Sequence, residues 1–179
     1  MRVFLLLVLA ACARSPSIAP AATPHWPEFA ARPDAPVLLV HYLAHCPILR
    51  RSLPALQKIS DDFPLLEVVF FESGEVSERE LFAEATADWR RPPAFVSDRS
   101  FLRARALKAT VAGEVFLFNS RRLGAALVYR GAIDDGASFD HKSRAPQRHY
   151  LREALGAQAR GEAPAVAEVP ALGCSLEIP

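Results

Sequence analysis

Short apolar runs alternate along the chain with stretches in which apolar residues recur every three or four positions. Runs rich in β-branched and aromatic residues predict strands over residues 37–43, 65–71, 94–96, 115–118 and 126–130. Helical spacing predicts helices over residues 47–60, 78–86, 101–107 and 147–160. Strands that first alternate with helices and then form a hairpin predict an α/β fold, a mixed β-sheet flanked by helices.

Proline and alanine dominate the segment before the first predicted strand. Residues 15–36 contain six prolines, and proline fixes its own φ and lacks the N–H that a helix interior needs. We therefore predict an extended Pro-rich tether over residues 12–35, followed by one domain with a C-terminal tail over residues 36–179. Trp26 and Phe29 are large for a linker, so we expect this end of the tether to dock on the domain.

The first residues have the pattern of an export signal. In residues 1–11, Arg2 precedes an uncharged apolar run that is too short to span a bilayer. The letters LAAC, ending at Cys12, resemble the lipobox of bacterial lipoproteins, which implies cleavage before Cys12 and lipid attachment to it. The resemblance implies an exported protein that is anchored to a membrane and faces the periplasm. Ala13 is not the aspartate that often retains lipoproteins at the inner membrane, which favours the outer membrane. The alternative is an ordinary signal peptide with a chance cysteine.

Charge and cysteine content narrow the function classes. Without the signal the chain has 20 basic and 20 acidic residues, a balance that gives no electrostatic footprint for nucleic acid, so we expect no such partner. If Cys12 carries the anchor, Cys46 and Cys174 remain, in a compartment where disulfides persist. Their positions in the chain do not determine whether they pair.

Cys46 is the candidate reactive group. It ends the loop after the first predicted strand, and Pro47 follows at the first helical position. Unpaired N–H groups and the helix dipole stabilise a thiolate there, so we expect an exposed and ionised sulfur. His45 could hydrogen-bond the sulfur or relay a proton, and Arg50, one turn on, could add positive charge. The alternative is a small buried apolar residue.

The order of elements resembles the thioredoxin fold: a buried strand, a cysteine at a helix start, a proline within that helix, a hairpin and a final helix. The segments HCPILRRSLPAL, EVFLFN, VYRGAIDD and GCSLEIP resemble a family of exported redoxin-domain proteins related to peroxiredoxins and thiol-disulfide oxidoreductases. The resemblance covers about residues 36–178. It implies that Cys46 is a nucleophile that acts on a protein disulfide or a peroxide.

The chain departs from the motifs of these families. Leu49 stands where a CxxC motif has its second cysteine, and Leu43 stands where peroxiredoxins have threonine. Gly113 replaces the usual cis-proline, so we expect a trans peptide and an altered substrate groove beside Pro47. Cys174 is the candidate resolving cysteine. The alternatives are a structural or free thiol, an intermolecular bridge, or a binding or assembly module that has lost catalysis.

Other candidate sites carry less weight. His41, His45 and Cys46 could be imagined as a site for copper or zinc, but no second Cys/His pair lies at ligand spacing. Phosphate-loop, HExxH and GxSxG motifs do not occur in the sequence. We therefore expect no metal and no cofactor, and for Asp134 and Asp135 we expect a role in a turn or cap. The sequence does not indicate the oligomeric state.

Overall fold

The computed structural model describes residues 26–27, 32–74, 77–120, 125–139 and 144–179. The predicted signal, Cys12 and Phe29 lie outside the described residues. The lipid anchor and the domain boundaries at residues 11/12 and 35/36 therefore stay predictions. None of the described helices is long and apolar enough to cross a membrane.

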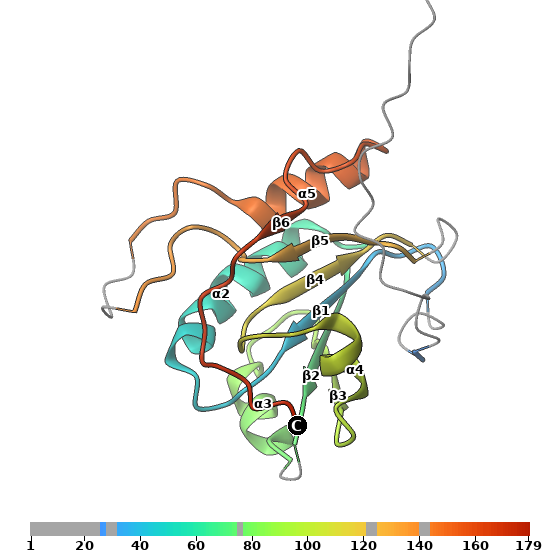
Figure 1. The fold of residues 1–179 in the computed structure, drawn as a ribbon. Helices are drawn as coiled ribbons and strands as arrows, with labels where there is room; N and C mark the ends of the chain where they lie inside the picture. The colour runs from blue at the N-terminus through green and yellow to red at the C-terminus, as the bar shows by residue number, and fades with distance from the viewer. Residues whose placement is uncertain (1–25, 28–31, 75–76, 121–124, 140–143) are drawn as a thin grey trace, which may run out of the picture.

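A six-stranded mixed sheet, in the order β3-β2-β1-β4-β5-β6, forms the centre of the fold (Figure 1). Its strands are β1 (Val37–His41), β2 (Glu67–Glu72), β3 (Ala94–Ser97), β4 (Val115–Phe118), β5 (Leu127–Gly131) and β6 (Glu168–Val169). Strands β1, β2 and β3 are parallel, β4 is antiparallel to β1, and β5 is antiparallel to β4. Strand β6 adds a short parallel pairing at the edge beside β5.

Helices cover both faces of this sheet. They are α2 (Pro47–Asp62), α3 (Arg79–Ala85), α4 (Leu102–Leu107) and α5 (Tyr150–Ala159). Apolar side chains of α2, α3 and α5 share one core cluster, whereas those of α4 belong to a second cluster on the opposite face (Figure 1). Helix α2 is one element of 16 residues that continues through Pro54. The predicted α/β architecture, a mixed sheet flanked by helices, is confirmed.

Strand β1 shows why the apolar pattern predicts the fold. Leu38 and Val40 enter the α2 cluster, while Val37 and Leu39 enter the α4 cluster. Every residue of this strand is buried, as expected for a strand covered on both faces. Burying one such side chain contributes about 1.5–3 kcal/mol, so the central strand contributes strongly to stability.

Two expectations about the ends of the domain are tested directly. Trp26 docks on the α4 face, where its ring packs edge-on against Phe118 at 6.5 Å, as expected for the end of the tether.

The last helix begins at Tyr150 instead of residue 147. The Asp135 carboxylate accepts the N–H groups of Gln147 and Arg148 and holds them in a loop. Asp135 thus has the turn role predicted for it.

Strands β5 and β6 approach each other at a glycine. Gly131 has a φ of +123°, and a Cβ at this position would overlap the carbonyl oxygen of Val169. Only glycine leaves room for this approach. The chain after α5 is therefore fixed to the sheet at a defined residue.

His41, at the end of β1, is buried, and among the described residues no salt bridge reaches it. Its Nε2 lies 3.1 Å from the Ser73 hydroxyl, its ring packs against Phe71, and its Nδ1 has no hydrogen-bond partner among the described residues. Burial lowers the pKa of His41 from 6.5 to about 4. The unfolded chain therefore binds a proton that the folded chain rejects as the pH falls from 6.5 to about 4.

We expect the free energy of unfolding to fall across this window because of His41, by at most about 1.4 kcal/mol per pH unit. Denaturant unfolding at pH 7, 6, 5 and 4.5 measures it. Because carboxylates also titrate there, the quantity of interest is the difference between the wild type and His41→Gln, which should show a shallower dependence. His149→Gln, at an exposed histidine, should match the wild type. Equal slopes for His41→Gln and the wild type would contradict the assignment.

Candidate active site

Cys46 lies at the N-terminus of α2, as predicted. Its extended backbone (φ −75°, ψ 110°) occupies the N-cap position, and its carbonyl oxygen accepts the Arg50 N–H at 3.0 Å. The Cys46 N–H donates to the Leu43 carbonyl at 3.0 Å, which closes the tight turn between β1 and the helix. Pro47 takes the first helical position, where no N–H is needed. The element boundary therefore puts the sulfur at the helix start.

The expectation that this sulfur is exposed is wrong. Cys46 has 0% of its surface exposed and belongs to the core cluster under α2. Its side chain makes no cap hydrogen bond to the N–H groups of the helix. The physical reason lies far along the chain, because the residues around Cys174 cover the site.

The C-terminal tail, residues 170–179, runs from β6 past the sheet (Figure 1) and ends beside α4, where the Pro179 carbonyl oxygen accepts two bonds from the Arg105 side chain at 2.7 and 3.1 Å. It pairs antiparallel with residues 110–112. The Ala112 N–H donates to the Cys174 carbonyl at 2.9 Å, and the Leu176 N–H donates to the Thr110 carbonyl at 3.1 Å. In this register the Cys174 N–H points at the Cys46 sulfur, 3.4 Å away.

Both cysteines are free thiols that lie next to each other. Burial raises the pKa of Cys174 to about 11, and a hydrogen bond to the Cys46 side chain and the charge of Cys46 act in the same direction. Cys174 therefore keeps its proton at neutral pH. The structure brings together the two cysteines that the sequence analysis considered as a pair.

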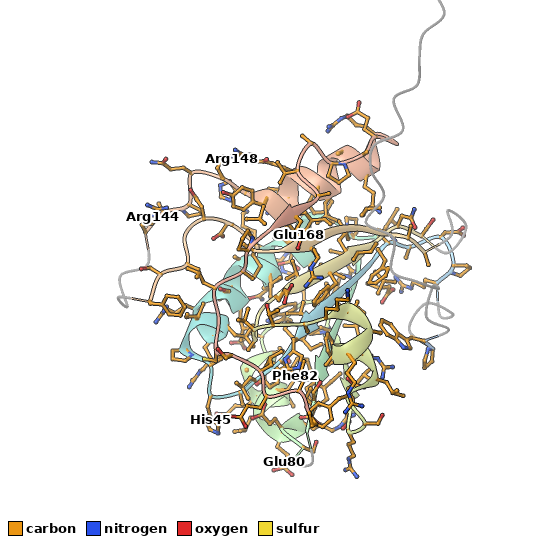
Figure 2. The ribbon with its side chains drawn as sticks, viewed as in Figure 1. His45, Glu80, Phe82, Arg144, Arg148 and Glu168 are labelled. Carbon is orange, nitrogen blue, oxygen red and sulfur yellow. The ribbon has the colours of Figure 1, made fainter. Side chains whose placement is uncertain are left out.

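A buried ion pair fixes the segment on which the tail rests. Glu114, 4% exposed, accepts the Thr110 N–H at 2.8 Å and its hydroxyl at 3.0 Å, and forms a salt bridge with Arg130. Arg130 also reaches Glu168 of β6 at 3.7 Å, on the route of the tail (Figure 2). The sequence analysis missed Glu114 and Arg130. The sequence signal that could have identified this ion pair is the acidic residue directly before the apolar run 115–118 and the basic residue at the end of the run 126–130.

Gly113 lies beside the first turn of α2, and its role in a substrate groove stays a prediction. Its N–H donates to the His41 carbonyl at 2.8 Å, and a Cβ at this position would lie 3.6 Å from the side chain of Leu49. Leu49 thus fills the space that faces the loop before β4. The described peptide bonds, including the one before Gly113, are trans, as expected. Pro47, the first residue of α2, is exposed.

The side chains of His45 and Arg50 face solvent, whereas Cys46 is buried. Both are exposed, and both line a pocket of about 270 Å³ together with Tyr42 and Leu81. Figure 2 shows His45 at the same end of the molecule as Glu80 and Phe82 of α3. Within the described chain no hydrogen bond joins either side chain to Cys46. Their predicted roles next to the thiol therefore gain no support from the contacts.

The three residues considered as a site for copper or zinc, His41, His45 and Cys46, do not form one cluster. His41 packs against Phe71 in the α4 cluster, whereas Cys46 belongs to the α2 cluster across the sheet. Among the residues that the structure describes, no group of three or more His, Cys, Asp or Glu side chains could hold a metal ion.

Comparison with known proteins identifies the fold. No protein-family model and no curated protein matches the chain. An uncharacterized conserved protein from Geobacillus kaustophilus aligns with a TM-score of 0.70 at 20% identity, covering 82% of this chain and 78% of that one. A hypothetical protein from Sinorhizobium meliloti 1021 aligns with a TM-score of 0.69 at 23% identity, covering 83% and 81%. A putative thioredoxin from Neisseria meningitidis aligns with a TM-score of 0.52 at 13% identity, covering 71% and 76%.

The fold of this protein is thioredoxin-like, as the sequence resemblance implied. At these identities the likeness concerns the fold alone. The activity has to be argued from Cys46 and Cys174 themselves.

The raised pKa of Cys174 predicts its reactivity. Its alkylation rate should rise about tenfold per pH unit between pH 7 and 10, because the reactive thiolate is the minor form below pH 11. Replacing Cys46→Ala removes the neighbouring charge and hydrogen bond, so the pKa of Cys174 should fall and its alkylation at pH 8 should accelerate. Mass spectrometric quantification of the alkylated peptide measures both rates.

Leu53→Ala, which truncates a buried side chain two turns into α2, controls for a general loosening of the helix. This variant should increase the alkylation rate of Cys174 less than Cys46→Ala does. A wild-type Cys174 that titrates at its ordinary value near 9 would contradict contact between the two thiols.

Proposed function

We propose that this protein is an extracytoplasmic thiol-disulfide oxidoreductase in which Cys46 is the nucleophile and Cys174 the resolving cysteine. The observation that supports the proposal is the 3.4 Å contact between the Cys174 N–H and the Cys46 sulfur. A hydrogen-bonded pair of free cysteines on a thioredoxin-like fold can alternate between a dithiol and a disulfide. Because position 49 is leucine, the second thiol comes from the tail.

The exchange balances in atoms and electrons. The Cys46 thiolate attacks one sulfur of a partner disulfide, the partner S–S bond breaks, and the departing partner sulfur takes up a proton. A mixed disulfide between Cys46 and the partner remains. Cys174 loses its proton and attacks the Cys46 sulfur, forming the Cys46–Cys174 bond and expelling the second partner thiolate. Two electrons pass from this protein to the partner, and the reverse exchange with a donor dithiol restores the reduced state.

The position of Cys174 suits a resolving thiol. Two of the causes that raise its pKa, the hydrogen bond to Cys46 and the charge of Cys46, disappear once the Cys46 sulfur is in a mixed disulfide. The pKa of Cys174 then falls at the step that needs its thiolate. Before that step Cys174 stays protonated and does not compete with Cys46 as the nucleophile.

A disulfide suits the site better than a peroxide does. Leu43 takes the place of the threonine that peroxiredoxins use, and it supplies no hydroxyl to orient a peroxide. A peroxide would convert the Cys46 thiolate to a sulfenic acid, which Cys174 would condense to the same disulfide with release of water. Measured rates with the two oxidants distinguish the substrates.

We also propose that the protein works at the surface of a membrane outside the cytoplasm, held there by lipid on Cys12. The motif LAAC supports this location. Loss of membrane association in Cys12→Ser, measured by cell fractionation, tests the location separately from the chemistry.

A second candidate function is a non-catalytic binding or assembly module. The complete burial of Cys46 favours it, since a buried free cysteine usually behaves as a small apolar residue. In that case replacement of Cys46 would leave partner retention in a pull-down unchanged.

The redox proposal predicts different products for two variants. Reduced Cys12→Ser protein incubated with glutathione disulfide should yield the Cys46–Cys174 disulfide and two equivalents of glutathione, detected by non-reducing peptide mapping. Cys174→Ser should instead accumulate glutathione on Cys46, because no resolving thiol remains. Cys46→Ser should lose at least about 100-fold in exchange rate, since a hydroxyl is a poor nucleophile near pH 7.

The parent Cys12→Ser protein and its Ser17→Ala derivative should behave alike, because Ser17 lies in the predicted tether. Exchange at an undiminished rate in Cys46→Ser, or a mixed disulfide at Cys174 in place of Cys46, would refute the assigned roles.

A further inference from the structure

The segment 110–112 offers a backbone edge directly beside Cys46. Its Ala112 N–H and Thr110 carbonyl are the groups that pair with the tail. The edge is held rigidly, because buried Glu114 accepts both the N–H and the hydroxyl of Thr110 and is itself paired with Arg130. Such a fixed edge can pair with an extended polypeptide through main-chain hydrogen bonds.

The tail occupies this edge as an extended peptide would. From Cys174 onward its residues alternate, with Cys174, Leu176 and Ile178 half-buried and the intervening residues exposed. Leu176 contacts both core clusters, and Cys174 contacts the cluster that contains Cys46. Between β6 and this pairing, Leu172 projects into solvent with 39% of its surface exposed. At its end the Pro179 carbonyl oxygen accepts two bonds from the Arg105 side chain. The tail is thus a surface segment, held by a few polar bonds and half-buried side chains, that can leave without dismantling the sheet.

The edge imposes a size limit one residue before the cysteine. A Cβ at Gly173 would overlap the carbonyl oxygen of Ala112 and lie 3.1 Å from the Cβ of Val111. The overlap is with backbone, so no side-chain movement relieves it. An occupant in this register therefore needs glycine before its cysteine and gains from an apolar residue two positions after it.

We propose that this edge is a peptide-binding groove that the tail occupies in place of substrate, and that the substrate is an extended polypeptide containing Gly-Cys-X-Leu or a similar apolar sequence. The inference rests on the proposed redox function and names its substrate class. The partner pairs with Thr110 and Ala112 in the register of the tail and thereby places its own cysteine beside Cys46, where Cys174 lies in this structure. After attack on the partner disulfide, the returning tail delivers Cys174 to resolve the mixed disulfide.

The test uses full-length reduced protein carrying Cys12→Ser and Cys174→Ser, so that Cys46 is the one remaining thiol. Two peptides, ALGCSL and ALACSL, are each activated as a mixed disulfide with 2-thiopyridine, and release of the thiopyridone reports their transfer to Cys46. Adding Gly173→Ala displaces the tail and should accelerate transfer from ALGCSL at least about tenfold. The glycine peptide should also react at least about tenfold faster than the alanine peptide.

Matched variants separate the outcomes. Gly156→Ala in α5, where a Cβ would meet one arginine side-chain atom at 3.5 Å, should leave both rates unchanged. If Gly173→Ala fails to fold by circular dichroism, Leu176→Pro removes the N–H that pairs with Thr110 and supplies the same comparison.

Equal rates for the two peptides after tail release would overturn the groove and leave the redox function standing. No transfer of either peptide to Cys46 after tail release, while a small alkylating agent labels Cys46, would overturn the redox function as well.

Discussion

Two backbone hydrogen bonds hold the tail against the segment before β4, and the environment of Cys46 depends on them. They seat Cys174 and its N–H on the sulfur. Each such bond contributes only about 0.5–1.5 kcal/mol net, whereas the sheet beneath is fixed by many buried side chains. The tail is also held at its end, where the Pro179 carbonyl oxygen accepts two bonds from the Arg105 side chain, and by the half-buried Leu176 and Ile178. The site thus combines a buried ion pair beneath with a surface segment above. A fully buried Cys46 and a reactive Cys46 are compatible when such a segment opens locally while the sheet stays folded.

The segment 110–112 beneath the tail is held in place by a buried ion pair. Glu114 and Arg130 are both largely buried, and a carboxylate in that position is tolerated because its oxygens accept bonds from Arg130 and from Thr110. The pair lies on two adjacent antiparallel strands, Glu114 just before β4 and Arg130 within β5. Since Arg130 also approaches Glu168, the same side chains that shape the peptide edge help to place the strand from which the tail departs.

The local pattern of apolar residues was sufficient to predict the elements that bury apolar residues along their whole length. Strand β1 and helix α2 follow from the runs VLLVHYL and LRRSLPAL, and the turn at Cys46 follows from the proline after it. Strand β6 could not be predicted, because two residues carry no periodicity and their strand geometry comes from long-range pairing with β5. The burial of Cys46 could not be predicted either, since its cover lies 128 residues further along the chain.

Two glycines admit a close approach of two backbones: Gly131 against Val169, and Gly173 against Ala112. Together these two contacts fix the positions of residues 169 and 173 relative to the sheet. Between the two fastenings the chain has only residues 170–172 in which to absorb a change of length. Successive side chains of an extended chain point to opposite sides, so one residue more or less there would turn the second sulfur toward solvent. The number of residues from Val169 to Cys174 therefore determines whether the thiol of Cys174 lies beside that of Cys46.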